Sequence, residues 1–300
     1  MKIRIKYKRF IEEKQAVAGV IEAILLIALV AIIISIIQIQ YIPEIMEERE
    51  ADHMDEVSNQ FSYLKAMIDI QALAGTIGVD LPLGQIPILT QITLGSKELP
   101  YFVTAPSYGE LSIEENTAKI MANPPIDDQI QGIPFSSIFY HAYNMYFIPQ
   151  TYIFEGGGII LNQSTGGSVM RADPSISIRN MSDKIEMKFY LPNIIGISGK
   201  KSNSGIGGCY IRTNYSSYKT YSKTPPVDNS YVLIYTNYLN AWNQSLNRIF
   251  GEEIKNGYVN IAITQHNGKD VVKIMSVNKP VVLDLTVVDI YGQVGPGWVI

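Results

Sequence analysis

The residues that most often carry catalysis or bind metal ions are few in this chain and lie far apart. The three histidines, His53, His141 and His266, do not form the H-x-x-x-H or H-E-x-x-H spacing that places two ligands on one helix face. The single cysteine, Cys209, excludes an intrachain disulfide and a site built from several cysteines. No G-x-S-x-G segment presents a serine nucleophile. We therefore expect no catalytic residue, no metal, no cofactor and no enzymatic activity.

Two further patterns have simpler structural interpretations. Residues 155–158 read Glu-Gly-Gly-Gly but lack the lysine and the following helix of a phosphate-binding loop, so they predict a tight turn entering a strand. Asp127 and Asp128 lie in a proline-containing loop, and Asp284 and Asp289 have opposite strand parity and would face different sides of a sheet. These carboxylates favour neither acid–base catalysis nor a calcium site.

Composition and charge narrow the class of protein. The chain has 300 residues, of which 47% are apolar, and 19 tyrosines, so it can fold around a sizeable core. Its formal net charge is −4, and no cluster of lysines outside the extreme N-terminus forms a basic patch. Because nucleic acids bind through basic surfaces, we expect no nucleic-acid partner.

The N-terminus carries the most specific signal in the sequence. Residues 1–16 hold six cations and two anions, and residues 17–42 are almost entirely apolar with one charge, Glu22. An apolar helix of about 20 residues crosses a lipid bilayer, so we expect the lipid bilayer as a partner of this single span. Glutamates follow the span, and by the positive-inside rule the N-terminus is cytoplasmic and the remaining body is extracellular.

The segment from Lys14 to Leu26, KQAVAGVIEAILL, resembles the class III signal peptide of archaeal type IV pilin-like proteins. The resemblance implies that a prepilin peptidase removes the basic leader and leaves the apolar helix on the mature chain. The family often has Val-Ser-Pro-Val-Ile-Gly where this chain has Val17-Ala18-Gly19-Val20-Ile21-Glu22, so the Ser-Pro pair is absent. Two cleavage points remain open, between Ala16 and Val17 or between Val17 and Ala18.

Glu22 has two interpretations. In pilin-like filaments, a glutamate near the start of the helix is thought to neutralise the N-terminal amine of a neighbouring subunit, so the resemblance implies other pilin-like subunits as partners. Alternatively, Glu22 lies at headgroup depth close to Lys14, where an ionised carboxylate costs little.

Three groups of short body segments resemble uncharacterised archaeal membrane-anchored surface proteins with pilin-like N-termini. They are 94–100 with Pro106 and 109–111; 155–160 with 169–174; and 235–238 with Ala241 and Trp242. The resemblance implies a role at the cell surface and no particular reaction.

A second helical segment is expected after the apolar span. Pro43 predicts a kink or short break, and residues 43–74 then form an amphipathic helix that Gly75 ends. Its apolar stripe consists of Met54, Val57, Phe61, Leu64 and Ile68. The stripe either packs on the body of the same chain, which we favour, or forms a coiled coil between chains, for which it is short.

Residues 75–300 predict a β-rich, sandwich-like body, and the fold class is therefore α+β. Short β-type runs punctuated by Gly and Pro cover residues 87–94, 101–104, 146–154, 158–161, 185–191, 210–215, 231–235, 258–264, 271–277 and 281–290. One embedded helix is expected over 238–250, and Asn267-Gly268 predicts a hairpin turn. Residues 75–150 form a candidate sub-lobe.

Four N-x-S/T sequons lie in the body, at Asn162, Asn180, Asn214 and Asn243, and are candidate glycosylation sites of an extracellular glycoprotein. The sequence favours a pilin-like structural or adhesion protein of the cell surface, anchored or assembled into a filament through its apolar helix. The alternative is a membrane-tethered receptor for an extracellular glycan or solute.

Overall fold

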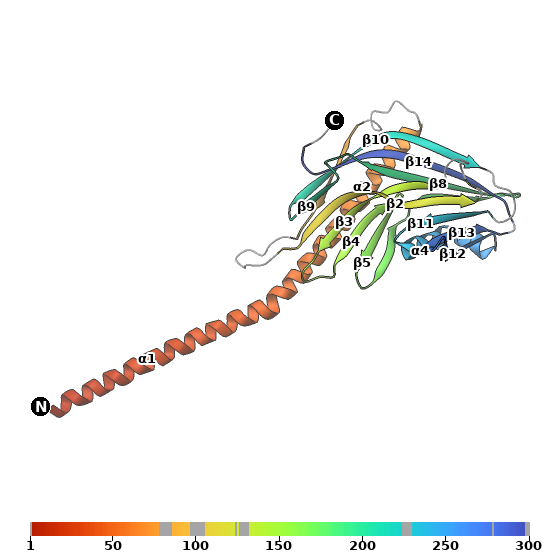
Figure 1. Ribbon diagram of the computed structural model, residues 1–300. Helices are drawn as coiled ribbons and strands as arrows, with labels where there is room; N and C mark the ends of the chain where they lie inside the picture. The colour runs from red at the N-terminus through yellow and green to blue at the C-terminus, as the bar shows by residue number, and fades with distance from the viewer. Residues whose placement is uncertain are drawn as a thin grey trace. The chain divides into compact units, whose positions relative to one another are not determined.

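A computed structural model describes residues 2–77, 86–96, 106–123, 125, 132–223, 230–277 and 279–297, with side chains from residue 18 onward. The chain divides into two compact units, Met1–Arg49 and Glu50–Ile300. The expected α+β fold is confirmed, since a long N-terminal apolar helix precedes a β-rich body with two curled sheets (Figure 1).

The N-terminal part is helical from Lys2–Ile36 (α1), through a π-helical turn at Ile37–Tyr41 (η1), to Ile42–Ile77 (α2). The helix therefore continues through Pro43 without the short break, and the irregularity near the proline is the π-helical turn that precedes it. The backbone N–H of Ile42 donates to the carbonyl of Ile37, five residues earlier, and Pro43 occupies the first turn of α2. A π turn directly before the proline accommodates its ring while the helix continues.

The predicted helix end at Gly75 is also wrong, because α2 continues to Ile77. A Cβ at position 75 would lie 2.2 Å from the ring of Tyr215. Gly75 thus permits close packing of α2 on a strand, and its role is steric rather than a helix cap.

In the part of the chain that the structure describes, the smaller sheet has five strands in the order β1-β10-β14-β8-β7. Their bounds are Ile88–Thr93 (β1), Gly208–Lys223 (β10), Val281–Val294 (β14), Ile185–Gly196 (β8) and Ser175–Asn180 (β7). β14 and β8 run parallel, and the other neighbours are antiparallel.

Within the described residues, the larger sheet has nine strands in the order β12-β13-β11-β2-β3-β4-β5-β6, with β9 paired to β2. Their bounds are Val259–His266 (β12), Lys269–Ser276 (β13), Tyr231–Tyr235 (β11), Tyr108–Asn123 (β2), Ile133–Tyr143 (β3), Gln150–Glu155 (β4), Gly158–Gln163 (β5), Gly167–Ala172 (β6) and Ser202–Gly205 (β9). Strands β2, β3, β6, β7 and β9 were not expected from the sequence, and the expected strand at 101–104 lies outside the described residues.

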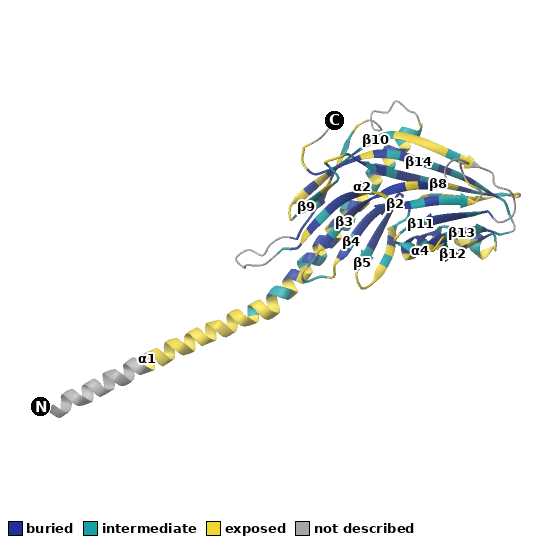
Figure 2. Cartoon of the chain, viewed as in Figure 1, coloured by how far each residue is buried: buried dark blue, intermediate teal, exposed yellow. Residues whose placement is uncertain are grey.

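The central strands of the larger sheet are buried on both faces (Figure 2). In β3, Ile138 and Tyr140 belong to one apolar cluster, whereas Phe135 and Phe139 belong to another. The first cluster contains the apolar stripe of α2, whose five residues are almost fully buried. This burial confirms that the stripe packs on its own chain, as we favoured, instead of forming a coiled coil.

The second cluster contains the expected embedded helix, which spans Leu239–Ile249 (α4) and is followed by Gly251–Lys255 (α5). Trp242, Leu246 and Phe250 are fully buried in it. The predicted hairpin turn joins β12 to β13, because Asn267 and Gly268 have φ of 52° and 74°, the positive values of a type I′ turn.

Candidate functional site

The apolar part of α1 is the first candidate functional element. All residues from 18 to 36 are exposed, and the helix from Ala18 contains an 18-residue window of mean hydropathy 3.2 with no share of it buried. By length and composition this helix can cross a membrane. Glu22 is exposed on it. Ala16 and Val17 lie in the helical backbone of α1, and their side chains are outside the described part.

The four sequons lie in different settings. Asn180 ends β7 and is exposed, with its side-chain oxygen 2.8 Å from Nζ of Lys279. Asn162 in β5 and Asn214 in β10 are half-buried. Asn243 lies within α4, and the hydroxyl of its sequon serine, Ser245, is buried and donates to Asp173.

The histidines do not meet one another. His53 Nε2 donates to the carbonyl of Thr93, His141 Nδ1 lies 3.1 Å from the hydroxyl of Thr151, and His266 Nδ1 is hydrogen-bonded to the hydroxyl of Tyr235. Among the residues that the structure describes, no three His, Cys, Asp or Glu side chains form a group that could hold a metal ion.

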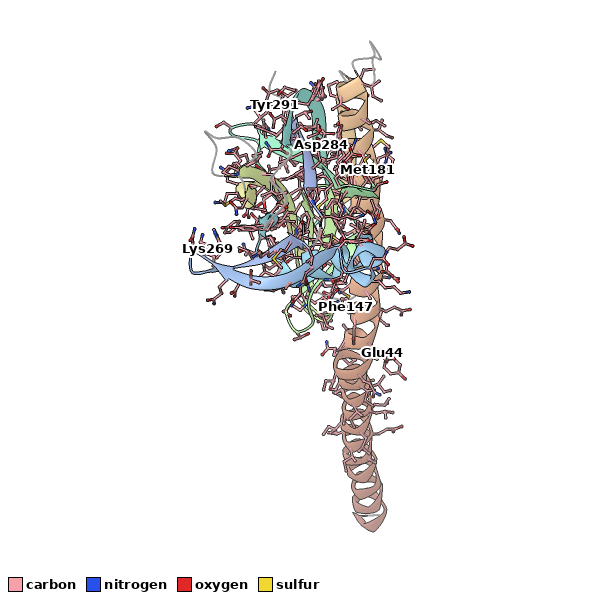
Figure 3. The ribbon with its side chains drawn as sticks, turned by 90° about the vertical axis from the view of Figure 1, so that its right-hand side faces the viewer. Glu44, Phe147, Met181, Lys269, Asp284 and Tyr291 are labelled. Carbon is pink, nitrogen blue, oxygen red and sulfur yellow. The ribbon has the colours of Figure 1, made fainter. Side chains whose placement is uncertain are left out.

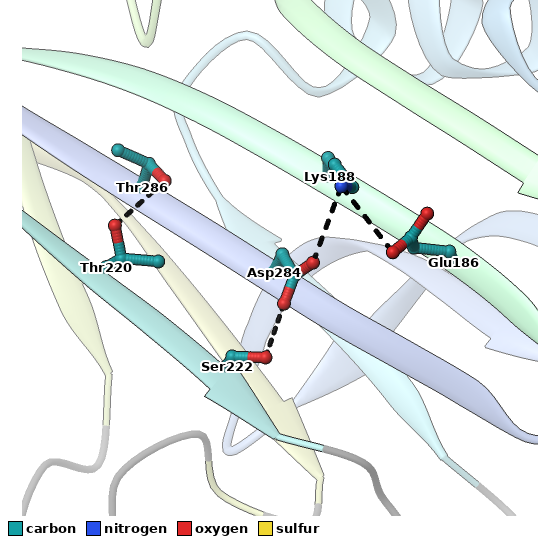
Figure 4. A network of polar contacts seen from close by, with 6 residues as sticks. All are labelled: Glu186, Lys188, Thr220, Ser222, Asp284 and Thr286. Atoms are coloured by element: carbon teal, nitrogen blue, oxygen red, sulfur yellow. Dashed lines mark hydrogen bonds and ion pairs between the residues drawn. The ribbon is translucent and has the colours of Figure 1, made fainter. Parts of the chain in front are cut away.

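The two aspartates of β14 have separate partners. Asp284 accepts a hydrogen bond from Ser222 and lies 3.9 Å from Nζ of Lys188 (Figure 4). Asp289 accepts from Asn193 at 2.7 Å and from Ser217 at 3.3 Å. Each carboxylate links neighbouring strands of the five-stranded sheet, so its role is structural. Asp127 and Asp128 lie outside the described residues.

Glu50 in α2 is fully buried and holds the connection between β3 and β4. Its carboxylate accepts three backbone hydrogen bonds, from Met145 at 3.0 Å, Tyr146 at 2.8 Å and Phe147 at 2.7 Å. The charge is thus satisfied by a ring of N–H donors, as buried carboxylates require.

Glu155, the last residue of β4, is the second fully buried glutamate. One carboxylate oxygen accepts from Thr236 at 2.6 Å and from the indole of Trp242 at 2.8 Å, and the other accepts from Ser137 at 3.3 Å. Burial raises the pKa of Glu155, and the hydrogen bonds from Thr236, Trp242 and Ser137 oppose that shift. The predicted turn is present directly after it, with φ of 56° and 84° at Gly156 and Gly157.

An open polar groove of about 780 Å³ lies beside Glu155. We call it the β11 groove, because its lining includes Tyr235 at the end of β11, together with residues of β2 on one side and of the β12–β13 hairpin on the other. The residues that we use to define it are Asn116, Thr117, Lys119, Tyr235, Thr236 and Asp270. Figure 3 shows Lys269, a further lining residue, at the tip of the hairpin.

The buried carboxylate of Glu155 supports both sides of the β11 groove. It binds the hydroxyl of Thr236 directly and reaches Thr117 through Ser137, whose hydroxyl lies 2.6 Å from that of Thr117. Thr117 belongs to an irregular segment of β2, where the register with β3 shifts between Glu114 and Ala118 and Asn116 has a φ of 56°. Bulges of this kind redirect side chains and are frequent beside functional sites.

The lining of the groove includes an aromatic pair and a lysine. The rings of Tyr235 and His266 are perpendicular, with centroids 6.1 Å apart, and Nζ of Lys119 lies 4.6 Å from the centre of the Tyr235 ring. Burial raises the pKa of Tyr235, so its hydroxyl remains protonated at neutral pH.

The sequence reasoning missed this groove and the role of Glu155. A glutamate followed by three glycines indicated the turn, but only the fold brings Ser137, Thr236 and Trp242 around its carboxylate. No family model, curated protein or solved structure matches this chain.

Proposed function

We propose that this chain is a single-pass, pilin-like protein of the cell surface, held by its apolar helix and presenting its β-rich body outside as a structural or adhesion module. The observation that carries the proposal is the fully exposed apolar surface of residues 18–36. Each exposed leucine or isoleucine loses about 1.5–3 kcal/mol of burial free energy in water, so the helix requires lipid or the helices of other subunits.

The charge pattern supports the direction of insertion. Basic residues 2–14 precede the apolar segment, and glutamates 44, 47, 48 and 50 follow it. Removal of the basic leader by a prepilin peptidase, before Val17 or before Ala18, would leave the apolar helix as the new N-terminus.

N-terminal sequencing of the membrane-bound protein from its native cell tests this processing. The proposal expects a chain that starts at Val17 or Ala18. A mature chain that retains Met1, or one cut after Ile42, would contradict the pilin-like part of the proposal.

Glu22→Gln separates anchoring from assembly. If Glu22 neutralises the amine of a neighbouring subunit, the variant stays in membranes but disappears from the fibres that shearing releases. If Glu22 lies at headgroup depth only, the variant behaves like the wild type. Glu44→Gln, which changes an exposed glutamate beyond the apolar segment, is the matched control.

A membrane-tethered receptor for a glycan or solute is the second candidate, and the β11 groove favours it. A receptor remains with membranes after shearing, whereas a filament subunit enters the fibre fraction. Asn180, the exposed sequon, is the site at which we expect a glycan if the body is glycosylated.

A further inference from the structure

We propose that the β11 groove binds an acidic saccharide, with its hydroxyls held by the amide and hydroxyl side chains of the groove and its carboxylate held by Lys119 and Lys269. The inference makes the receptor alternative more specific. It rests on that proposed function in one respect, because the body must be extracellular to meet such a ligand. Binding itself can be measured on the isolated protein and does not depend on where the protein resides.

The polar groups of the groove fit a polyhydroxylated ligand. Asn116, Asn237 and Asn267 supply amides, which offer both donors and acceptors to vicinal hydroxyl groups. The hydroxyls of Thr117 and Thr236 already donate within the protein, so they can only accept from a ligand. The aliphatic part of the lining consists of Ala118, Met121, Pro134 and Leu239 and is smaller than the polar part. A protein–protein interface usually centres on buried aromatic or arginine anchors, so this lining suits a hydrophilic ligand better.

The charges of the groove favour a single negative group on the ligand. Lys119 comes from β2 and Lys269 from β13, on the two sides of β11, and Asp270 is the one carboxylate among the described lining residues. Two lysines suit one carboxylate well. They are too few for a polyanion such as nucleic acid, whose binding requires neutralisation of many phosphates.

The walls are held in place before a ligand arrives. The hydroxyl of Thr236 is bound at 2.6 Å to the buried Glu155, and it also accepts the backbone N–H of Tyr238 at 3.0 Å. On the other side, the backbone N–H of Asn116 donates to Ser136 at 3.3 Å, and Thr117 contacts Ser137. Fixed walls reduce the entropy lost on binding. Glu155 is therefore a positioning residue of the site.

Calorimetric titration of the full-length protein in detergent tests the inference. The acidic ligand is a galactose trimer in which one unit is galacturonate, so that it carries one carboxylate, and the neutral galactose trimer is the comparison. We expect the acidic trimer to bind at least about tenfold more tightly than the neutral one, as one charge-assisted contact implies. Added salt should weaken the acidic trimer more than the neutral one.

Lys119→Met should lower the affinity for the acidic trimer about tenfold, since methionine keeps the apolar stem and removes the charge. Lys273→Met is the matched control, because Nζ of Lys273 lies 4.4 Å over the Tyr231 ring in the same sheet and outside the groove lining. Glu155→Gln should weaken both trimers by a similar factor, because it loosens the walls rather than removing a ligand charge.

Equal affinity for the two trimers, binding of neither, or equal effects of Lys119→Met and Lys273→Met would overturn the inference. Membrane fractionation of the same variants keeps the two proposals distinguishable. If Lys119→Met remains in membranes but no longer binds the acidic trimer, the result supports the binding site in the groove. If the wild-type chain is soluble but still binds the trimer, only the membrane anchor is refuted.

Discussion

At the residue scale, two fully buried glutamates, Glu50 and Glu155, organise the body, and each has a different chemical environment. Glu50 accepts only backbone N–H groups, whereas Glu155 accepts from two hydroxyls and an indole. Burial of a carboxylate is costly unless such donors surround it. Both residues therefore fix the position of the segments that donate to them, and substitution of either residue should have a measurable effect on stability.

Glu50→Ala should destabilise the body by about 2–4 kcal/mol, because three backbone N–H groups lose their buried acceptor. Urea unfolding measures the loss, and hydrogen exchange should accelerate at Met145, Tyr146 and Phe147. Glu47→Ala, at an exposed position of the same helix, should change the unfolding free energy by less than about 0.5 kcal/mol. Unaltered exchange at those three amides in Glu50→Ala would contradict this account.

Glu155→Gln tests a pH dependence. Because burial raises the pKa of Glu155 in the folded state above its ordinary 4.5, the folded protein holds the proton more strongly than the unfolded chain. That contribution to stability is complete below pH 4.5 and is lost as the pH rises through the raised pKa. Glutamine does not titrate, so the stability advantage of the wild type over Glu155→Gln should be larger at about pH 4 than at about pH 8.

Unfolding curves of the two proteins at both pH values give the comparison. A stability advantage of the wild type that is the same at both pH values would mean that the three hydrogen bonds balance the effect of burial on the pKa of Glu155. An advantage that is larger at the higher pH would mean that they outweigh it. Either result would contradict the raised pKa.

At the element scale, α2 is the helix around which one side of the larger sheet forms its core. The spacing of three and four residues predicted its buried face correctly, and Phe61 lies with its ring centroid 5.7 Å from that of Tyr152. Its polar residues also contact the body, since Gln60 donates to Thr93 and accepts its backbone N–H, both at 2.8 Å.

Phe61→Ala should lower the free energy of unfolding by about 3–5 kcal/mol, as removal of a buried aromatic ring leaves a cavity. Tyr63→Ala is the control on the same helix, because Tyr63 is 52% exposed, and its effect should stay below about 1 kcal/mol. Chemical denaturation of both variants compares them. Equal losses would show that the stripe does not form the core.

Three of the strands that the sequence did not predict, β2, β7 and β9, lack a regular alternation of buried and exposed residues. β2 contains the polar run Glu114-Glu115-Asn116-Thr117 at its register shift, which interrupts the alternation of apolar residues. β7 is largely exposed, and β9 has only four residues. Neither strand therefore has a buried face that would appear in the sequence as an alternating apolar pattern. Strands with clear alternation, such as β12 and β13, were predicted nearly to their ends.

The candidate groove could not be predicted for a related reason. Lys119 and Tyr235 are 116 positions apart and become direct cross-strand neighbours only through the pairing of β2 with β11. Long-range pairing of this kind leaves no local pattern. The local features of the groove were predictable, and the Asn267-Gly268 turn at its edge was predicted correctly.

At the scale of the whole molecule, the two units differ in whether their apolar residues are exposed or buried. The first unit carries an apolar helical surface that is exposed from residue 18 to residue 36, whereas the second buries its apolar residues in two clusters. A chain with both features requires an apolar environment for one part and water for the other.

Fractionation of native cells, followed by external protease treatment of the intact cells, tests this claim most directly. We expect the mature chain to remain in carbonate-washed membranes and its body to be digested from outside while the apolar segment stays with the membrane. A chain recovered from the cytosol, or a body that the protease reaches only after the cells are lysed, would contradict the account.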